Sequence, residues 1–304
     1  MKHLQIIKNR KWNYIFSITL LVLGLGAWAI WGLKLGLDFT GGSLLEVKYE
    51  NVARPQTSDI QKVLLDNKIA GVVIQPSGAD SFVLRTKELT MTEKDALTGS
   101  LQKAVSSTAN AQVVENRYEL IGPSVSAALR SRAVWATVLA AFFIILYVAF
   151  AFRKVSAPVA SWKYGIMAVV ALLHDLAVVV GIFAILGHFA GVEVDSLFVT
   201  ALLTVLGFSV HDTIVVFDRI RENLLTHRRA SFSEIVNDSV NQTMARSINT
   251  SLVTMLVLLA LLLFGAASIQ WFIVALLIGI FIGTYSSIFV ASCLLVTVNE
   301  WKSK

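Results

Sequence analysis

The chain has 304 residues, of which 56% are hydrophobic and 15% are charged, and its formal net charge is +6. Soluble domains carry about 25% charged residues, so this composition excludes an ordinary soluble protein and indicates an integral membrane protein. The Lys and Arg residues lie mostly beside apolar runs, where they set orientation, so the positive charge does not indicate nucleic-acid binding. Cys293 is the single cysteine, which excludes an intrachain disulfide framework.

A short basic segment opens the chain and precedes an apolar run over Tyr14–Leu33, with Trp28 and Trp31 near its far end. The run is longer than the roughly 7–15 residues of a signal-peptide core, and no clear cleavage site ends it. Aromatic residues at the end of a span are typical of the membrane interface. Residues 1–33 therefore predict a cytoplasmic N-terminus followed by an uncleaved first span.

Residues 34–131 are more polar and read as a soluble domain of about 95 residues, large enough for its own core. Periodicity and turn residues predict strand, helix, strand, strand, helix and strand over Ser43–Tyr49, Thr57–Ile69, Gly71–Gln75, Ser81–Thr86, Thr92–Ser107 and Ala111–Ile121. This order is the ferredoxin-like pattern of an α+β domain. We expect Thr57 or Ser58 to cap the first helix, and Thr92 to cap the second, with Asp95 as its N3 residue.

Five further apolar runs are long enough to cross a bilayer: Ala133–Phe152, Tyr164–Leu186, Leu197–Phe217, Ser247–Phe264 and Trp271–Val298. Ahead of the fifth span, Ser231 and Glu234 form a capping box, and an apolar stripe predicts an amphipathic helix near residues 231–245, lying along the membrane surface. Gly279 and Gly283 in the last span form a GxxxG pattern, which favours close helix packing.

Six spans place both chain ends on one side of the membrane. Nearly all of the basic residues near span ends fall in the segments on that side, whereas the two short outer turns hold none. The positive-inside rule therefore predicts cytoplasmic termini and an extracytoplasmic 34–131 domain. We predict a polytopic α-helical membrane protein with six transmembrane helices, in which a ferredoxin-like α+β domain separates the first helix from a five-helix membrane domain over residues 132–304.

Asp212 lies roughly five residues inside the cytoplasmic end of its span, about 8 Å deep at 1.5 Å per residue. A carboxylate at such a position is costly, so it is a functional candidate that needs a partner, and Arg246 at the mouth of the next apolar run is the predicted one. The functional interpretation is a proton or cation carrier gated by Arg246. The alternative is a snorkelling or structurally paired carboxylate.

Asp175 lies deeper, about 16 Å from the start of its span, and a structural hydrogen-bonding role and a proton-relay role both remain open for it. His174 is adjacent in sequence but about 100° away around a helix, so the two need not share a site. His211 titrates near physiological pH in its unperturbed form, although helix packing is the preferred interpretation. Three hydroxyl residues are expected to join helices rather than bind ligands: Thr213, Thr250 and Ser251.

Enzyme motifs are absent: the sequence holds no phosphate-binding loop, no HExxH, no GxSxG and no Cys/His metal cluster. We therefore expect no enzymatic activity, no cofactor and no metal. Buried charges point to an ion gradient as the energy source, which supplies about 2.3 kcal/mol per charge at 100 mV.

Several segments together resemble the SecF family: Gly36–Gly42 (GLDFTGG), Gly122–Pro123, His174–Asp175, Gly207–Asn223 (GFSVHDTIVVFDRIREN) and Arg246–Ser251 (RSINTS). SecF is the smaller half of the bacterial SecDF protein-export complex and is related to RND-type transporters. The residues that look like the family signature are Asp38, Gly41, Gly42, Asp218, Arg219, Arg221, Glu222 and Asn223.

The resemblance implies a protein of the bacterial inner membrane, with its large loop in the periplasm. It implies proton-driven assistance to the passage of a preprotein through SecYEG, together with the partners SecD and YajC. The family's proton pathway maps onto Asp212 and Arg246, and we assign Asp175 and His211 to the same pathway. His211 stands where the family commonly has Asn.

An RND-like exporter of small molecules or lipids is the alternative function, and a purely structural scaffold subunit is a third. About 95 residues is small for the outer domains of a drug pump and suits a domain that handles peptides. The predicted domain size therefore favours protein translocation.

Overall fold

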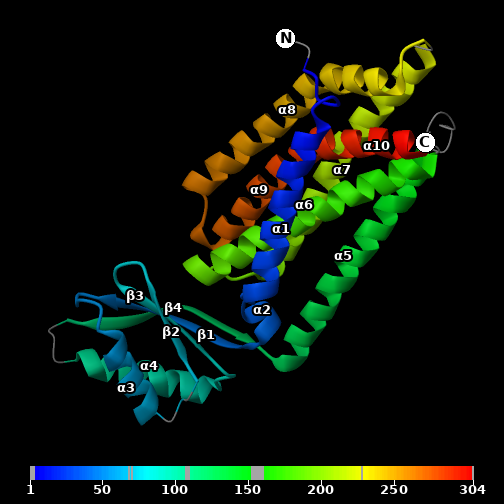
Figure 1. Ribbon diagram of the computed structural model, residues 1–304. Coiled ribbons are helices and arrows are strands. Elements are labelled where there is room, and N and C mark those ends of the chain that lie inside the picture. Colours follow the sequence, from blue (N-terminus) through cyan, green and yellow to red (C-terminus); the bar gives the residue numbers. More distant parts are fainter. Residues whose placement is uncertain are drawn as a thin grey trace. The chain divides into compact units, whose positions relative to one another are not determined.

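The structure is a computed structural model that describes residues 4–67, 69, 71–106, 110–151, 161–226 and 229–302 (Figure 1). The chain divides into two compact units. The membrane unit comprises Met1–Lys34 and Ala133–Lys304, and the sheet unit comprises Leu35–Arg132. Two predicted element ends, Ser107 and Phe152, lie outside the described residues.

The sheet unit opens with the short helix α2 (Leu37–Thr40), which leads into a four-stranded antiparallel sheet. The elements that follow are β1 (Gly42–Glu50), α3 (Thr57–Asp66), β2 (Val73–Ser77), β3 (Ser81–Thr86), α4 (Met91–Val105) and β4 (Gln112–Ile121). The strands are ordered β2-β3-β1-β4, so the first and last strands of the unit pair with each other. This arrangement confirms the predicted ferredoxin-like α+β fold.

The core of the sheet unit lies between one face of the sheet and the two helices, which cover the same face in Figure 1. Leu45 and Val47 alternate along β1 and are fully buried, as is Leu84, which is paired opposite Leu45 on β3. Ile60 of α3 and Leu101 of α4 close this core from the helical side. Alternate residues of the strands and the apolar face of each helix thus form a single hydrophobic core.

Both helix starts in the sheet unit differ from the prediction. The N-cap of α4 is Thr90 rather than Thr92, and Glu93 rather than Asp95 is its N3 residue. The carboxylate of Glu93 accepts a hydrogen bond of 2.8 Å from the backbone N–H of Thr90, which lowers the pKa of Glu93 below its usual range. Two overlapping patterns, T-x-x-E and T-x-x-D, compete here, and the longer Glu side chain reaches back to the cap.

In α3 the N-cap is Gln56, one residue before the predicted Thr57 or Ser58. The side chain of Asp59 accepts a hydrogen bond of 3.3 Å from the backbone N–H of Gln56, which fixes the first turn. A glutamine is a rare cap, so its position was not recognisable from the sequence.

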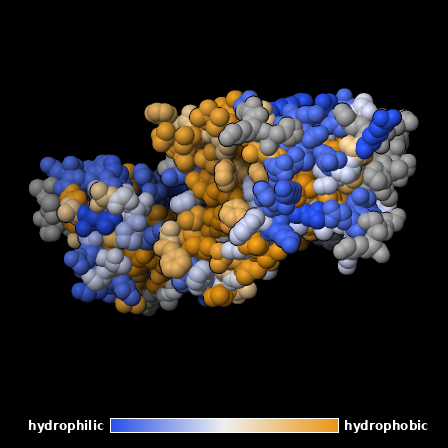
Figure 2. All heavy atoms as spheres, turned by 45° about the horizontal axis from the view of Figure 1, so that its top comes forward, coloured by the Kyte–Doolittle hydropathy of each residue, from blue (hydrophilic) through white to orange (hydrophobic). Residues whose placement is uncertain are grey.

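Six helical segments of the described residues are long and apolar enough to cross a membrane, which confirms the predicted class. They are α1 (Arg10–Trp31), α5 (Pro123–Ala151), α6 (Ser161–Ala190), α7 (Ser196–Thr226), α8 (Phe232–Phe264) and a last span made of α9 (Gln270–Ser286), a π-helical segment (Ser287–Ala291) and α10 (Ser292–Lys302). Figure 2 shows a broad apolar surface over this unit, with hydrophilic side chains gathered at one end of it.

The predicted surface helix near residues 231–245 is not a separate element. It begins at the predicted capping box, where Ser231 accepts a hydrogen bond from the backbone N–H of Glu234, and it continues without interruption into the fifth span as α8. No Gly or Pro stands between this amphipathic stretch and the span, so nothing in the local sequence ends the helix. The predicted helix is therefore the first part of α8, and its position along the membrane surface stays a prediction.

Glycines set the closest helix contacts in the membrane unit. A Cβ built on Gly279 of α9 would lie 2.2 Å from Val205 Cγ2 of α7, and one on Gly283 would lie 2.8 Å from Ser209 Cβ. The predicted GxxxG packing face is thereby confirmed, with α7 as its partner. Gly181 of α6 is in similarly close contact with α1, because a Cβ there would lie 2.2 Å from the Gly24 Cα.

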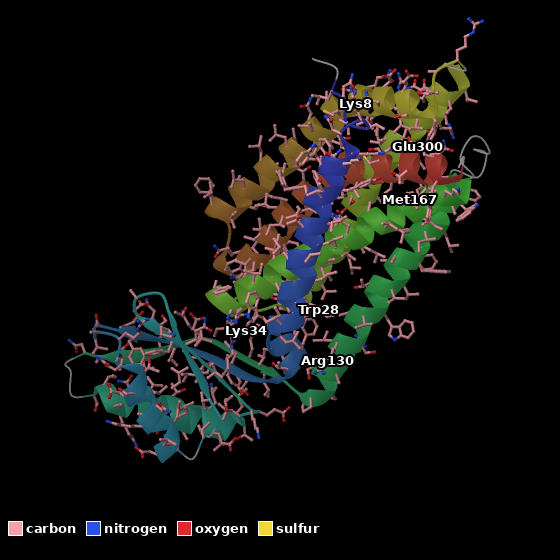
Figure 3. All side chains as sticks on the ribbon, viewed as in Figure 1. Lys8, Trp28, Lys34, Arg130, Met167 and Glu300 are labelled. Carbon is pink, nitrogen blue, oxygen red and sulfur yellow. The ribbon has the colours of Figure 1, made fainter. Side chains whose placement is uncertain are left out.

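An ion pair joins the two chain ends at one end of the membrane unit. Lys8 and Glu300 lie at one end of α1, and Trp28 and Lys34 lie at the other (Figure 3). At the first end, Arg10 forms a bidentate ion pair with Glu300, at 2.9 and 2.6 Å. This pair joins the beginning of α1 to the end of α10 and so holds the two chain ends together.

Candidate functional site

Asp175 is held by three hydrogen bonds in the interior of the membrane unit, where it is 1% exposed. Its Oδ2 accepts hydrogen bonds from Ser209 Oγ of α7 at 2.6 Å and from Ser286 Oγ of α9 at 2.7 Å. Its Oδ1 lies 3.0 Å from Nδ1 of His174. A buried carboxylate needs such partners, because an unpaired one in an apolar interior is very costly.

The sequence left open whether His174 and Asp175 share a site, and the structure shows that they do. Both belong to α6, and their side chains bond directly despite the angle between adjacent positions. Ser209 and Ser286 hold the other oxygen of the carboxylate. Asp175 thus ties α6 to α7 and to the C-terminal end of α9.

Asp212 lies in a second polar cluster in which the hydroxyls come from α8 and α9. It is 2% exposed, and its Oδ2 lies 3.4 Å from both Ser251 Oγ and Thr284 Oγ1. These two hydroxyls are themselves 2.6 Å apart. Three helices therefore converge on one carboxylate through groups that can either donate or accept a hydrogen bond.

The predicted ion pair between Asp212 and Arg246 is not present among the described residues. The side chain of Arg246 is exposed, whereas Ser247, the next residue of α8, is buried. Ser247 and Ser251 are four residues apart on the helical face towards the bundle, so Arg246 is turned about 100° away from that face. The prediction placed Arg246 on a helix that does contact Asp212, namely α8, but the arginine lies on a different face of that helix.

Arg246 instead lines a polar cavity of about 330 Å³ near the charged end of α7. Asp218, Arg219 and Glu222 of α7 line the same cavity, together with Thr243 of α8. Arg219 is paired with Glu222 at 2.6 Å, and Arg221 is paired with Asp218 at 3.1 Å. The structure thus brings Arg246 together with the DRIREN segment rather than with Asp212.

Hydroxyl and backbone groups of α7 and the π-helical segment extend the polar cluster around Asp175. Ser209, the donor to Asp175, is three residues before Asp212. Its carbonyl oxygen accepts hydrogen bonds from Thr213 Oγ1 and from Ser287 Oγ, both at 3.2 Å. Thr213 and Ser287 also bond each other at 2.8 Å, so Thr213 joins helices as predicted. π-helical segments often occur at functional sites.

Two hydroxyl residues of the last span that contact the carboxylates directly, Thr284 and Ser286, were not predicted as site residues. Their signal was a cluster of hydroxyl residues in an otherwise apolar run: Thr284, Ser286 and Ser287. Ser251 was expected only to join helices, and it also contacts Asp212. Thr250, by contrast, is exposed and bonds its own helix through the carbonyl of Arg246.

His211 is exposed on α7, whereas the adjacent Asp212 is buried. His211 shares an exposed stripe of helical spacing with the small or polar residues Thr200, Thr204 and Gly207, and Leu197 begins the stripe. A bilayer-spanning helix that exposes such residues is suited to contact another helix, because small side chains allow close approach and polar ones form hydrogen bonds.

Asn223 ends the DRIREN segment and is the buried member of the family-like signature on α7. Its amide donates hydrogen bonds to Ser239 Oγ at 2.8 Å and to Gln242 Oε1 at 3.0 Å, both on α8. Gln242 Oε1 also accepts a hydrogen bond from Arg219 Nε at 2.5 Å. These contacts fasten the charged end of α7 to the start of α8.

Gly41 and Gly42 occupy the turn between α2 and β1 in the sheet unit, and both have positive φ, at 71° and 113°. A Cβ on Gly42 would lie 2.4 Å from the carbonyl oxygen of Thr86, which allows no side chain there. Asp38 lies in α2, half-buried, outside the membrane unit. The structure therefore explains both glycines of this segment by backbone geometry.

Comparison with known families and proteins gives consistent matches. Residues 100–301 match the family of the protein export membrane protein SecD/SecF, C-terminal, and residues 27–51 match the SecD/SecF GG motif. The protein translocase subunit SecF of Thermobaculum terrenum is 44% identical, over 99% of this chain and 95% of the relative. SecF of Anaerolinea thermophila is 37% identical, over 99% of this chain and 96% of the relative.

Among solved structures, the crystal structure of SecDF, a translocon-associated membrane protein from Thermus thermophilus, is similar, with a TM-score of 0.81 and 32% identity. The match covers 99% of this chain and 39% of that SecDF chain, so this chain spans well under half of the larger protein.

Proposed function

The chain belongs to the SecF family of protein translocase subunits, and on this premise we propose that it assists protein translocation as the SecF-type half of a SecD–SecF complex. The observation that carries the proposal is the end-to-end match to relatives named SecF. These relatives are named as translocase subunits, which favours protein translocation over the export of small molecules or lipids.

In this proposal Asp212 is the group that takes up and releases a proton. An ionised carboxylate only accepts hydrogen bonds, whereas a protonated one also donates one. Its two hydroxyl neighbours, Ser251 and Thr284, lie on different helices, so a change of protonation redirects hydrogen bonds on α8 and α9 together. Asp175 has a structural role in this proposal, because its hydrogen bonds with Ser209 and Ser286 hold α6 to α7 and α9.

The partner SecD is placed against the exposed stripe of α7 formed by Thr200, Thr204, Gly207 and His211. This contact would cover polar groups that are costly to expose to lipid. Arg246, exposed at the adjacent polar cavity, would receive an acidic group of the partner, which replaces the intrachain pairing predicted from the sequence.

We further place the protein in the bacterial inner membrane, with cytoplasmic termini and a periplasmic sheet unit that engages emerging preprotein beside SecYEG. Lys8, Arg10 and Lys11 lie at the N-terminal end of α1, and by the positive-inside rule they support a cytoplasmic N-terminus (Figure 3). YajC is included as a further partner on the family resemblance alone.

The test is export of a secreted preprotein into inverted membrane vesicles that carry Asp212→Asn in place of the native chain. The amide removes the titratable proton but keeps the size of the side chain. We expect the stimulation of export by the proton gradient to fall at least tenfold, while the variant is retained at normal level with its partner.

Asp66→Asn is the matched control, because it makes the same chemical change on an exposed residue of the sheet unit. It should export as the native chain does. Full gradient stimulation with Asp212→Asn would show that Asp212 is structural and would leave the chain as a scaffold subunit.

A further inference from the structure

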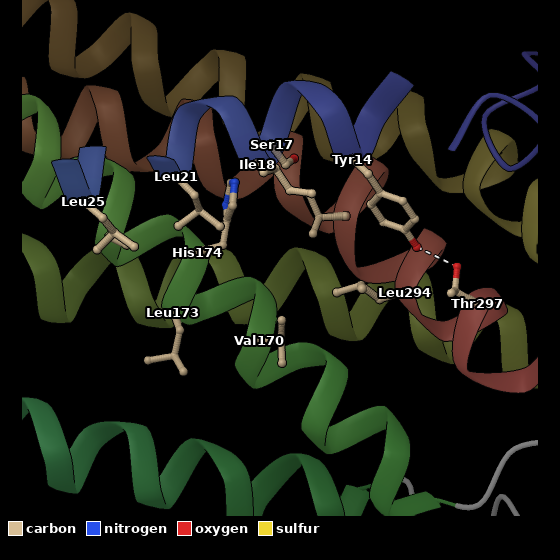
Figure 4. A pocket seen from close by; sticks show the side chains of 12 residues that line it. Tyr14, Ser17, Ile18, Leu21, Leu25, Val170, Leu173, His174, Leu294 and Thr297 are labelled. Atoms are coloured by element: carbon tan, nitrogen blue, oxygen red, sulfur yellow. Dashed lines mark hydrogen bonds between the residues drawn. The ribbon is translucent and has the colours of Figure 1, made fainter. Parts of the chain in front are cut away.

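A groove of about 620 Å³ lies between α1, α6 and α10 in the membrane unit (Figure 4). Its walls are aliphatic side chains such as Ile18, Leu21, Leu173 and Leu294. Ile18 and Leu173 are each more than half exposed, so the groove is open on its outer side. A volume of this size suits a small apolar molecule.

The groove lies beside a close backbone contact between α1 and α6. Gly24 and Gly181 bring the two backbones together, since a Cβ placed on Gly181 would lie 2.2 Å from the Gly24 Cα. Nearer the start of α1, larger side chains such as Tyr14 and Ile18 stand between the helices and α10. The space beside the glycine contact is therefore left unfilled.

His174 differs from the other polar residues of the lining, which are Tyr14, Ser17 and Thr297, in having a ring nitrogen that is unpaired within the described part of the chain. The residue is 4% exposed, and its ring projects from α6 towards α1 (Figure 4). Nδ1 bonds Asp175, but Nε2 is buried without a hydrogen-bond partner among the described residues. The neighbouring polar groups are already paired, since Tyr14 bonds Thr297 at 2.8 Å and Ser17 bonds Tyr285 at 3.1 Å.

The hydrogen on Nε2 follows from charge balance. A net charge on the buried His174–Asp175 pair would be costly in an apolar interior, so the neutral pair is favoured. A neutral pair has the shared proton on either Nδ1 or Asp175 Oδ1, and in both arrangements the imidazole carries a hydrogen on Nε2. The group facing the groove is therefore a donor that lacks an acceptor.

The depth of His174 in the membrane further limits the classes of ligand that can reach it. The residue is 13 positions after Ser161 and 16 before Ala190 in α6, or about 20 and 24 Å from the two helix ends. A phospholipid head group stays outside the hydrocarbon core of about 30 Å, so it does not reach this level. The acceptor must belong to a molecule whose polar atoms enter the middle of the bilayer.

We propose that this groove binds a membrane-soluble quinone-class molecule, with a ring carbonyl accepting a hydrogen bond from His174 Nε2 and the hydrocarbon tail lying along α1. Such a molecule combines a neutral, carbonyl-bearing ring with an aliphatic chain, which matches one buried donor in an aliphatic groove. The site is separate from the Asp212 cluster and does not depend on the translocation proposal.

The probe is a benzoquinone with a decyl tail, added to the purified full-length protein in detergent and followed by native mass spectrometry and by the thermal unfolding midpoint. We expect one probe molecule per chain and a saturable rise in the midpoint. Decylbenzene, which has the same tail and no carbonyl, should bind at least tenfold more weakly.

Two variants test the site itself. His174→Asn keeps an amide nitrogen in the place of Nδ1 and removes Nε2, so it should lose the tenfold preference for the quinone over decylbenzene. Leu21→Trp fills the groove with His174 intact and should abolish binding of both probes. The second variant decides the question if the first does not fold.

His188→Asn is the control, because His188 stacks on Trp31 outside the groove lining and should leave binding unchanged. Equal binding of decylbenzene and the quinone to the native chain would overturn the proposal. So would an unchanged preference in folded His174→Asn, or unchanged quinone binding in folded Leu21→Trp.

Discussion

Asp175 and Asp212 are buried carboxylates with different surroundings. Asp175 has two short bonds from serine hydroxyls and a third contact with His174, so its hydrogen-bonding capacity is well occupied. Asp212 has two longer contacts of 3.4 Å, to Ser251 and Thr284. The looser cluster is better suited to a group that changes its protonation state, and the tighter one to a group that holds helices together.

Gly42 provides a test at the same scale. Its φ is 113°, and a Cβ at this position would lie 2.4 Å from the carbonyl oxygen of Thr86, so there is no room for a side chain. We expect Gly42→Ala to destabilise the sheet unit by about 2 kcal/mol, through backbone strain and displacement of β3. The measurement is the denaturant midpoint of the sheet-unit transition in the full-length protein.

Gly99→Ala is the control for that experiment, because Gly99 lies in α4 and a Cβ added there would have no atom within 4 Å. Alanine there should be neutral or stabilising by up to about 1 kcal/mol, since glycine is a poor helix residue. If Gly42→Ala were as stable as Gly99→Ala, the backbone explanation of this glycine would be wrong.

At the scale of elements, the membrane unit depends on how closely α9 approaches α7. Gly279 packs against Val205 and Gly283 packs against Ser209, so a side chain of α7 fills the space beside each glycine. This approach places Thr284, Ser286 and Ser287 beside the two aspartates, which are on α6 and α7. Packing of small residues therefore positions the polar clusters.

Gly279→Ala tests this dependence. The added methyl group collides with Val205, and we expect a loss of about 1–3 kcal/mol, typical of overpacking in a well-packed interior. The double variant Gly279→Ala with Val205→Ala should recover much of that loss, because the second change removes the colliding atoms. Thermal unfolding in detergent measures both, and a double variant no more stable than the single one would contradict the proposed contact.

At the scale of the whole molecule, the sheet unit has its own core and closed strand order. Leu45, Leu84 and Leu101 are fully buried within it, and β1 and β4 pair along most of their length. We expect residues 35–132, expressed alone without the spans, to fold as a soluble monomer with a cooperative thermal transition and a mixed α/β circular dichroism spectrum. A non-cooperative, aggregation-prone product would show that the unit needs the membrane helices for its stability.

The sequence by itself determined the class, the six spans, the ferredoxin-like order and the glycine packing face. Each of these depends on composition or on periodicity along one segment, as in the alternating β1 residues or the uncharged runs of the spans. The family resemblance added residue positions, such as Asp212 and the DRIREN segment, but not their contacts.

The tertiary structure alone decided which side chains meet. It separated Arg246 from Asp212, joined His174 to Asp175, and brought hydroxyls of the last span to both carboxylates. It also merged the predicted surface helix with the fifth span in α8. The physical reason is that helix rotation and side-chain torsions, set by packing against neighbouring helices, determine which face each residue presents, and a local pattern does not contain them.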